Sequence, residues 1–243
     1  MTPRQSIIVP CYNESRGIPS LVERFAALRT GEGDPWELVL VDNGSTDGSA
    51  AVLAEAAERH APWLRVVTVP QPNVGYGHGI VTGLRAARGE LLAWTHADGQ
   101  TPPGDAVAAL ALLAGSADPR RTFVKGRRRD RMFKDAAFTA GMEAAALALL
   151  GERLVDINAQ PKAFHRDLLA LADKPPIDLS LDLYLFHTAR RHGFDVRTFD
   201  VRFGAREHGE SRWAFNWRSK ARNIARTLTF MRALRQGGEW RVA

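Results

Sequence analysis

The sequence predicts an α/β domain of three layers around a mainly parallel central sheet. Short apolar runs alternate with longer amphipathic segments in the first half, which is the pattern of strand–helix–strand units. Polar clusters follow three of these runs, as expected where parallel strands end at one edge of a sheet. The chain has 243 residues, 45% of them hydrophobic, so its length allows a sizeable core.

Four apolar runs in the first half are predicted to be strands. They cover residues 6–9, 37–41, 65–69 and 91–95. Three helices are expected between them, at 19–28, 47–59 and 76–88. The first shows apolar residues at helical spacing, and the second follows a Ser/Thr/Asp cluster suited to capping a helix. Right-handed crossovers then bring the strand ends to one edge, where a ligand is expected to bind.

The second half is less regular, and no Ser/Gly-rich linker separates it from the first. Residues 122–125 and 196–203 are predicted strands. Three further helices are expected at 136–150, 181–192 and 213–234. The second of them is closed by Gly193. We therefore expect one domain with an extension rather than two separate domains.

The net charge of +6 is distributed unevenly along the chain. Residues 120–134 and 212–243 carry +7 each, which leaves −8 on the rest. Two basic blocks on an acidic body predict local anionic partners rather than general affinity for nucleic acid. The alternative is two solvated faces.

The composition also bounds the compartment. A lone cysteine, Cys11, cannot form an internal disulfide, and the chain shows neither a signal peptide nor an apolar run of membrane-spanning length. A cytoplasmic location is therefore expected.

Four polar blocks carry a resemblance. They are Val-Pro-Cys-Tyr-Asn-Glu at 9–14, Val-Asp-Asn-Gly-Ser-Thr-Asp-Gly-Ser at 41–49, Asn-Val-Gly-Tyr-Gly at 73–77, and His-Ala-Asp-Gly-Gln with a Pro pair at 96–103. In this order and spacing they resemble the donor-site motifs of family 2 glycosyltransferases. Residues 206–213 resemble the late Arg…Gly-Glu-Ser-Lys/Arg motif of the branch that includes the dolichyl- and polyprenyl-phosphate sugar synthases. The resemblance implies the glycosyltransferase A-type fold, a nucleotide-binding α/β sandwich.

The resemblance implies a nucleotide-diphosphate sugar as donor. The residues it assigns to the donor are Pro10, Tyr12, Glu14, Asp42, Gly75 and Tyr76. Asp42, at a strand end, would accept from a base N–H, and Glu14 could accept from a ribose hydroxyl. Asp42 could instead cap a turn. The glycines at 75–79 would let the backbone approach a ligand, or would serve packing.

The fourth block resembles the family's metal motif. Asp98 and Gln100 match that motif, and His96 stands where the family has a carboxylate. A cation at a diphosphate commonly uses one or two carboxylates and completes its shell with phosphate oxygens and water. The expected cofactor is Mn²⁺ or Mg²⁺, and an imidazole at position 96 favours Mn²⁺ if it ligates. His96 could instead lie behind the metal ligands without touching the cation, or contact the sugar.

The basic residues predict the acceptor side. The resemblance favours a polyprenyl phosphate, whose ionised oxygen needs positioning rather than a base. The candidates for the acceptor phosphate are Arg127, Arg128, Arg129, Arg131 and Ser211, in what reads as an acceptor-side loop and the late motif. Arg206 and Arg212 would face the donor diphosphate or the acceptor phosphate. The family implies inversion at the anomeric carbon, in one displacement.

Two alternatives are open. A hydroxyl acceptor on a glycan or small molecule would need a base, for which Asp182 or Asp178 is a candidate. Asp182 could equally cap its own helix or form a salt bridge within it. The replacement of a carboxylate by His96 leaves a non-catalytic nucleotide-sugar binding protein as the third possibility.

The domain prediction follows from these assignments. A catalytic domain is expected over 1–211, with a donor half at about 1–118 and an acceptor half at about 119–211. Residues 212–243 are expected to form a basic amphipathic helix. Its apolar stripe could lie peripherally on the cytoplasmic face of an anionic membrane, or could pack on the protein's own core.

Overall fold

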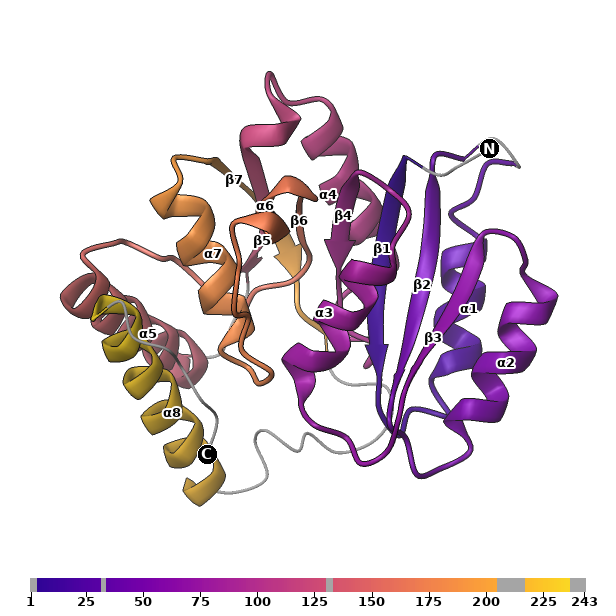
Figure 1. The fold of residues 1–243 in the computed structure, drawn as a ribbon, viewed down its shortest axis with the longest axis horizontal. Coiled ribbons are helices and arrows are strands. Elements are labelled where there is room, and N and C mark those ends of the chain that lie inside the picture. The colour runs from indigo at the N-terminus through magenta and orange to yellow at the C-terminus, as the bar shows by residue number, and fades with distance from the viewer. Residues whose placement is uncertain (1–3, 32–33, 130–132, 205–216, 237–243) are drawn as a thin grey trace.

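The computed structural model describes residues 4–31, 34–129, 133–204 and 217–236. A seven-stranded sheet lies at its centre, in the order β3-β2-β1-β4-β6-β5-β7 (Figure 1). The strands are β1 (Gln5–Cys11), β2 (Trp36–Asn43), β3 (Leu64–Val69), β4 (Leu91–Trp94), β5 (Thr122–Arg129), β6 (Lys162–His165) and β7 (Asp195–Arg202). The helices are α1 (Ile18–Ala26), α2 (Ser49–Arg59), α3 (Tyr76–Ala86), α4 (Pro103–Ala114), α5 (Phe133–Leu150), α6 (Asp167–Ala170), α7 (Leu181–Arg191) and α8 (Trp217–Arg235), with a short 3-10 helix, η1 (Pro119–Arg121).

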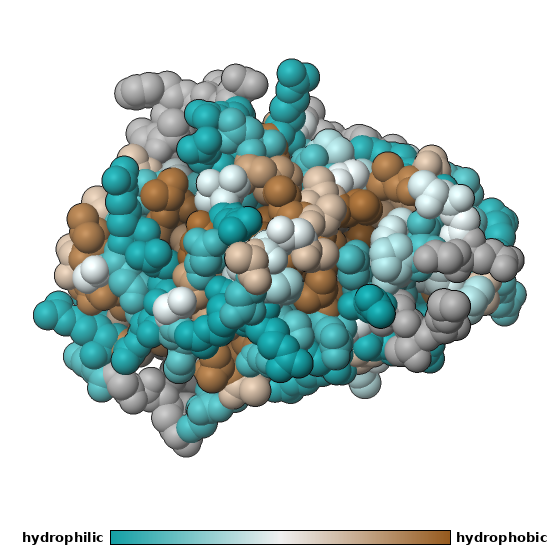
Figure 2. Space-filling model, turned by 90° about the horizontal axis from the view of Figure 1, so that it is seen from above, coloured by the Kyte–Doolittle hydropathy of each residue, from teal (hydrophilic) through white to brown (hydrophobic). Residues whose placement is uncertain are grey.

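The sheet is mainly parallel, as predicted. Strands β3, β2, β1 and β4 pair in parallel, and β5 pairs in parallel with β7. Among the described strands only β6 runs the other way, because it pairs antiparallel with both β4 and β5. The carboxyl ends of β1 and β2 point to the lower edge in Figure 1. Figure 2 views the molecule from the opposite, upper side, where apolar and polar side chains are interspersed.

Each face of the sheet carries its own layer of helices because successive strand residues point to opposite faces. Ile7 packs in one buried cluster with Phe25 of α1 and Leu110 of α4. Its neighbour Ile8 packs in the other, with Leu84 of α3 and Leu185 of α7. The three predicted layers are therefore present, with α1, α2 and α4 covering one face.

Several predicted boundaries moved. Helix α4 and strand β6 were not predicted; α4 begins at a proline, which suits the first helical position. Strand β5 continues to Arg129, so the prediction of a loop at 127–129 is wrong. The strand continues because β7 pairs with it over that whole stretch, from Thr122↔Asp195 to Arg129↔Arg202.

The last helix packs on the protein. α8 lies beside α5 in Figure 1, and its Phe230 and Met231 are buried in the same cluster as Leu185. The Phe230 ring meets Tyr184 of α7 at 6.1 Å between centroids. Near the carboxyl end of α8, the apolar stripe therefore packs on the protein's own core, which was the alternative to a position on a membrane surface.

Candidate functional site

Three strand ends form one polar edge, as the sequence predicted. β1 and β2 are in register through Pro10↔Val41 and Cys11↔Asp42, and hydrogen bonds join the loops that follow. The amide of Asn13 donates to Ser45 Oγ at 3.1 Å, and the amide of Glu14 donates to Ser49 Oγ at 3.0 Å. The donor candidates after β1 are thus fixed against the loop after β2.

Asp42 is buried near the end of β2, just before that loop. Its Oδ1 accepts from the amide of Ser45 at 3.0 Å, and Gly44 takes a left-handed φ of 74° in the same turn. The turn-capping role considered for Asp42 is therefore present in the structure. A contact between Asp42 and a nucleotide base stays a prediction.

The glycines of the third block have a packing reason. A Cβ on Gly75 would come within 2.2 Å of the Ile177 carbonyl oxygen, and one on Gly77 within 2.4 Å of the Pro176 carbonyl oxygen. The His78 amide donates to the same Ile177 oxygen at 3.1 Å. The loop before α3 therefore lies backbone against backbone on the segment before α7. Donor binding by Gly75 stays a prediction.

The metal motif follows β4 and contacts both sides of the site. Asp98 Oδ1 accepts from the Gln100 amide at 3.2 Å, and Asp98 lines a small cavity together with Glu14 and Arg24. Gln100 Nε2 donates to the Gly204 carbonyl at 3.1 Å. His96 stacks on Tyr76 with 5.7 Å between ring centroids. The structure thus brings Glu14 and Asp98 together, and joins His96 to Tyr76.

The metal-ligating side chains of this motif suit a cation that takes most of its ligands from the diphosphate of a bound nucleotide sugar. Among the described residues, no three His, Cys, Asp or Glu side chains are placed to hold a metal together. One carboxylate and one amide oxygen are hard ligands, and Mg²⁺ or Mn²⁺ at a diphosphate takes the remaining oxygens from phosphate and water. Asp98 and Gln100 therefore fit a divalent cation at a donor diphosphate. Ligation by His96 stays a prediction.

The arginine cluster is already engaged by carboxylates. Arg127 and Arg129 both contact Asp200, with nitrogen–oxygen distances of 2.8 and 2.7 Å. Arg128 donates through Nε to Asp156 Oδ1 at 3.0 Å and through its amide to Oδ2 at 2.8 Å. An acceptor phosphate at these arginines would have to share them, so their predicted role stays a prediction.

The ion pair of Arg128 and Asp156 is largely buried. Burial alone would raise the pKa of Asp156, but the hydrogen bonds and charge of Arg128 outweigh it and hold that pKa below its usual value. Asp156 also takes a left-handed φ of 46°, and its amide donates to Glu143 Oε1 at 2.8 Å. This pair therefore stabilises the turn after α5.

Asp182 lies in a buried network beneath the site. It forms an ion pair with Lys162 and accepts from Gln160 Nε2 at 2.7 Å, and all three side chains are almost fully buried. Gln160 Nε2 also lies 3.3 Å from the Tyr76 hydroxyl. Burial, together with the charge of Asp182, keeps the pKa of Tyr76 well above 10, so this hydroxyl stays protonated. The structural roles considered for Asp182 were a cap or a salt bridge within its own helix, whereas the structure pairs it with Lys162 of β6.

Lys125 and Lys162 were missed as candidate residues. They face each other across β5 and β6 and are both fully buried. Lys125 Nζ donates to the carbonyls of Gly126 and Val155, at 2.8 and 3.1 Å. Burial, aided by the charge of Lys162, lowers the pKa of Lys125 to about 7. For Lys125 the available signal was a charged residue at the end of the predicted strand 122–125, whereas β6, which holds Lys162, was not predicted.

Lys125 makes stability depend on pH. Its pKa falls from 10.5 to about 7 on folding, so between these values the unfolded chain binds more protons. We therefore expect its contribution to raise the free energy of unfolding as pH rises through this window, measured by urea denaturation. Lys125→Met should lose that contribution, whereas Lys174→Met, at an exposed position, should keep it. An unchanged slope in Lys125→Met would contradict this explanation.

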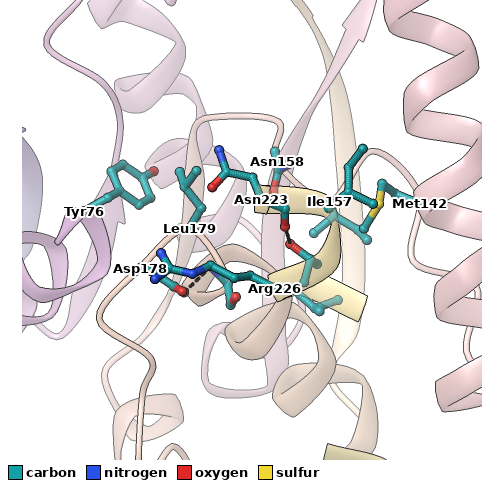
Figure 3. A pocket seen from close by; sticks show the side chains of 12 residues that line it. Tyr76, Met142, Ile157, Asn158, Asp178, Leu179, Asn223 and Arg226 are labelled. Atoms are coloured by element: carbon teal, nitrogen blue, oxygen red, sulfur yellow. Dashed lines mark hydrogen bonds between the residues drawn. The ribbon is translucent and has the colours of Figure 1, made fainter. Parts of the chain in front are cut away.

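A larger cavity lies beside Tyr76, on the predicted acceptor side (Figure 3). It measures about 160 Å³ and is bounded by α5, α7, α8 and the segments at 157–158 and 178–180. Arg226 and Asn223 of α8 and Asn158 bring polar groups to it, and none of the three was predicted. Asp178, which was a candidate base, also lines it. Of the remaining candidates, Arg131, Arg206, Ser211 and Arg212 lie outside the described residues.

A family model decides the classification. The model described as glycosyl transferase family 2 matches residues 6–146, which is more than half of the chain. The chain belongs to glycosyl transferase family 2. As a family 2 glycosyltransferase it is an enzyme, so the third possibility, a non-catalytic binding protein, is not retained.

Two curated relatives of this family 2 glycosyltransferase carry the same name. The chain is 29% identical over 213 residues to the undecaprenyl-phosphate 4-deoxy-4-formamido-L-arabinose transferase of Pectobacterium carotovorum subsp. carotovorum (strain PC1). It is 30% identical over 215 residues to the enzyme of the same name from Edwardsiella ictaluri (strain 93-146). Each match covers 86% of this chain and 62% of the relative, so the chain spans less than two thirds of the curated relatives it matches.

Solved structures share the fold of this family 2 glycosyltransferase. Glucosyl-3-phosphoglycerate synthase from Mycobacterium tuberculosis, in complex with Mn²⁺, UDP and glucosyl-3-phosphoglycerate, matches with a TM-score of 0.72 at 20% identity, covering 98% of this chain and 81% of that one. The same enzyme with Mg²⁺ and UDP matches with a TM-score of 0.70 at 19% identity, over 98% of this chain and 81% of that one. The predicted A-type glycosyltransferase fold is therefore confirmed. In the part of the chain that the structure describes, no helix is long and apolar enough to cross a membrane.

Proposed function

We propose that this enzyme transfers a sugar from a nucleotide-diphosphate sugar to a polyprenyl phosphate, with inversion and with a divalent cation at the donor diphosphate. The observation that carries the proposal is the arrangement around Tyr76. Its ring stacks on His96 of the metal motif and also lines the cavity on the acceptor side. A donor held at Asp98 and an acceptor held in the cavity would meet at this residue.

The donor half of the proposal rests on three carboxylates at one edge. Glu14 and Asp98 line the same small cavity, and Asp42 lies near the end of the neighbouring strand β2. Asp98 and Gln100 would hold Mn²⁺ or Mg²⁺, which offsets charge on the leaving nucleoside diphosphate. Structures of the same fold have been solved with Mn²⁺ or Mg²⁺ and UDP, which supports this assignment.

The acceptor half is supported by chemistry and by the relatives' names. A phosphate monoester is largely ionised near neutral pH, with a second pKa of about 6, so its oxygen can attack without a general base. Asp182 is occupied by Lys162 and Gln160, which fits a reaction that does not need it as a base. The two relatives above are named as transferases of undecaprenyl phosphate.

A hydroxyl acceptor is the second candidate, favoured by one observation. Asp178 lines the acceptor-side cavity, where a carboxylate could take a proton from a hydroxyl group. Its Oδ1 accepts from the Ser180 amide at 2.9 Å. Among the described residues no salt bridge holds Asp178 as Lys162 holds Asp182, so Asp178 is the base that this alternative would use.

A peripheral position at the cytoplasmic face of a membrane belongs to the same proposal. Arg222 and Arg232 are exposed on α8, so their charges are accessible to the headgroups of anionic lipids. Such residues add attraction to anionic lipids of about 1 kcal/mol each near the surface. The catalytic domain at 1–211 and the segment at 212–243 are thus proposed to act together, although α8 also packs on α5.

Product analysis tests the proposal. The purified chain is incubated with Mn²⁺, a panel of nucleotide sugars, and either farnesyl phosphate or a set of hydroxyl acceptors. We expect a glycosyl phosphate whose anomeric configuration, by proton NMR, is opposite to that of the donor. Retained configuration would overturn the single displacement. Transfer to hydroxyl acceptors alone would favour the Asp178 alternative.

A further inference from the structure

The acceptor-side cavity combines apolar and polar lining residues, with an apolar end at Met142 and Ile157. Its apolar lining comes from Met142 of α5, Ile157, Leu179, Leu183 of α7 and Ile224 of α8. Its polar lining comes from Asn158, Asp178, Ser180, Asn223, Arg226 and Thr227. Figure 3 shows Tyr76 on one side of this space and Met142 with Ile157 on the opposite side. Such a lining suits a ligand that is polar at one end and apolar at the other.

The size of the cavity limits what it can hold. Its volume of about 160 Å³ equals the space of about five water molecules at about 30 Å³ each. Pockets that enclose whole drug-sized ligands are larger, at about 300–1,000 Å³. A long acceptor would therefore place only a short portion here, and the rest would leave through the opening.

The position of the cavity identifies that portion. Tyr76 lines the cavity and stacks on His96, two residues before Asp98. The group of the acceptor that enters beside Tyr76 is therefore the one nearest to the donor sugar. In an acceptor that reacts through a phosphate, that group is the phosphate and the carbons bonded to it.

We infer that this cavity binds the phosphate and the first isoprene unit of a prenyl monophosphate. The inference rests on the proposed function and adds a binding site to it. The guanidinium of Arg226 and the amide groups of Asn158 and Asn223 hold the phosphate, since these groups donate hydrogen bonds to anionic oxygens. Met142, Ile157 and Ile224 cover the isoprene unit, which is removed from water there.

The charges of the lining select a monophosphate. Arg226 contributes one positive charge and Asp178 one negative charge, so the cavity carries no surplus of positive charge for a second phosphate group. A diphosphate in the same place would bring further negative charge close to Asp178. A prenyl diphosphate is therefore a weaker ligand of this site.

Binding measurements with matched tryptophan variants test the inference. Met142→Trp fills the apolar end, whereas Leu147→Trp on the same helix adds the same ring at a position that is 54% exposed. Isothermal titration with farnesyl phosphate should give a dissociation constant that is raised about tenfold or more in Met142→Trp, the loss of about two buried methylene groups. Leu147→Trp should bind as the wild type does.

A second pair of variants distinguishes a loss of binding from a loss of folding. Ile224→Glu places a charge in the apolar part of the lining, and Ala225→Glu places it at the adjacent exposed position of α8. Only Ile224→Glu should weaken farnesyl phosphate, with the melting temperature of both variants close to that of the wild type. Glycerol 3-phosphate and farnesyl diphosphate should each bind the wild type at least about tenfold more weakly than farnesyl phosphate.

The outcomes separate this inference from the proposed function. Wild-type transfer to farnesyl phosphate with unchanged affinity in both cavity variants would overturn the cavity assignment and leave the function standing. Equal binding of glycerol 3-phosphate would also overturn it, because the isoprene unit would then contribute nothing. Transfer by the wild type to hydroxyl acceptors and never to farnesyl phosphate would overturn the proposed function itself.

Discussion

An Asp98→Ala variant should lose sugar transfer by roughly 10²–10³-fold while it keeps its fold, which is the loss typical when one charge-stabilising group is removed from a site. Asp98 is the carboxylate of the metal motif, and it lines the small cavity with Glu14. Without it the donor diphosphate would lose the side chain that holds the counter-charge to its leaving group. Initial rates with saturating Mn²⁺ measure the loss.

The matching control and a second readout do not depend on turnover. Asp195→Ala removes an exposed carboxylate at the edge strand β7, where its partner is the nearby Arg197, and should transfer at the wild-type rate. Mn²⁺ should strengthen UDP binding by the wild type and by Asp195→Ala, as a shift in melting temperature, but not by Asp98→Ala. A Mn²⁺-dependent shift that survives in Asp98→Ala would contradict the role given to this carboxylate.

Lys162→Met should lower the free energy of unfolding by about 3–5 kcal/mol, because it leaves Asp182 buried without its counter-ion. Lys162 is fully buried on β6 and Asp182 is buried at the start of α7, so water cannot replace the lost partner. Urea denaturation followed by circular dichroism measures the change. Asp182→Leu should lower the free energy of unfolding by a similar amount, since it leaves the charge of Lys162 buried without a partner.

The double variant distinguishes the ion pair from simple packing. Lys162→Met combined with Asp182→Leu removes both charges and should recover most of the stability lost in either single variant. As a reference, Arg59→Ala breaks the exposed pair with Glu55 and should cost no more than about 0.5 kcal/mol. Strictly additive losses in the double variant would mean that the two charges do not compensate each other.

This network changes how a test of Asp182 must be read. As the base of a hydroxyl-transfer reaction, Asp182 should be needed for the rate. In the structure it is also needed for stability, so a slow Asp182→Asn enzyme would not by itself identify a base. Asp178 has no such buried partner among the described contacts, and its variants report on acceptor chemistry more directly.

The sequence predicted the strands of the first half well because their signals are local. The strands β1 to β4 are apolar runs, and the polar residues that follow them are adjacent in sequence, so their meeting at one edge followed from parallel topology. Strand β6 has only four residues and begins with a lysine, which gave no such signal. Arg127 to Arg129 read as an exposed loop because their pairing strand, β7, lies about seventy residues away in sequence.

The acceptor half depends on contacts between distant segments. The side chains that contact Lys162, Arg128 and Tyr76 lie in distant segments of the chain, and no spacing of residues in the sequence predicts these contacts. The cavity exists because α8 folds back against α5 and brings Arg226 beside Asp178, whose positions are 48 residues apart in the chain. Periodicity predicts an apolar stripe on such a helix but cannot say what will cover it.

The contact of Gly75 and Gly77 with the backbone of Pro176 and Ile177 has a consequence for how this enzyme can change over evolution. It aligns the donor and acceptor halves through main-chain atoms, which side-chain substitutions leave in place. Residues that line the proposed acceptor cavity can therefore be exchanged, and new acceptors bound, without disturbing the alignment on which the proposed displacement depends. Glycine at these two positions is the condition for that freedom.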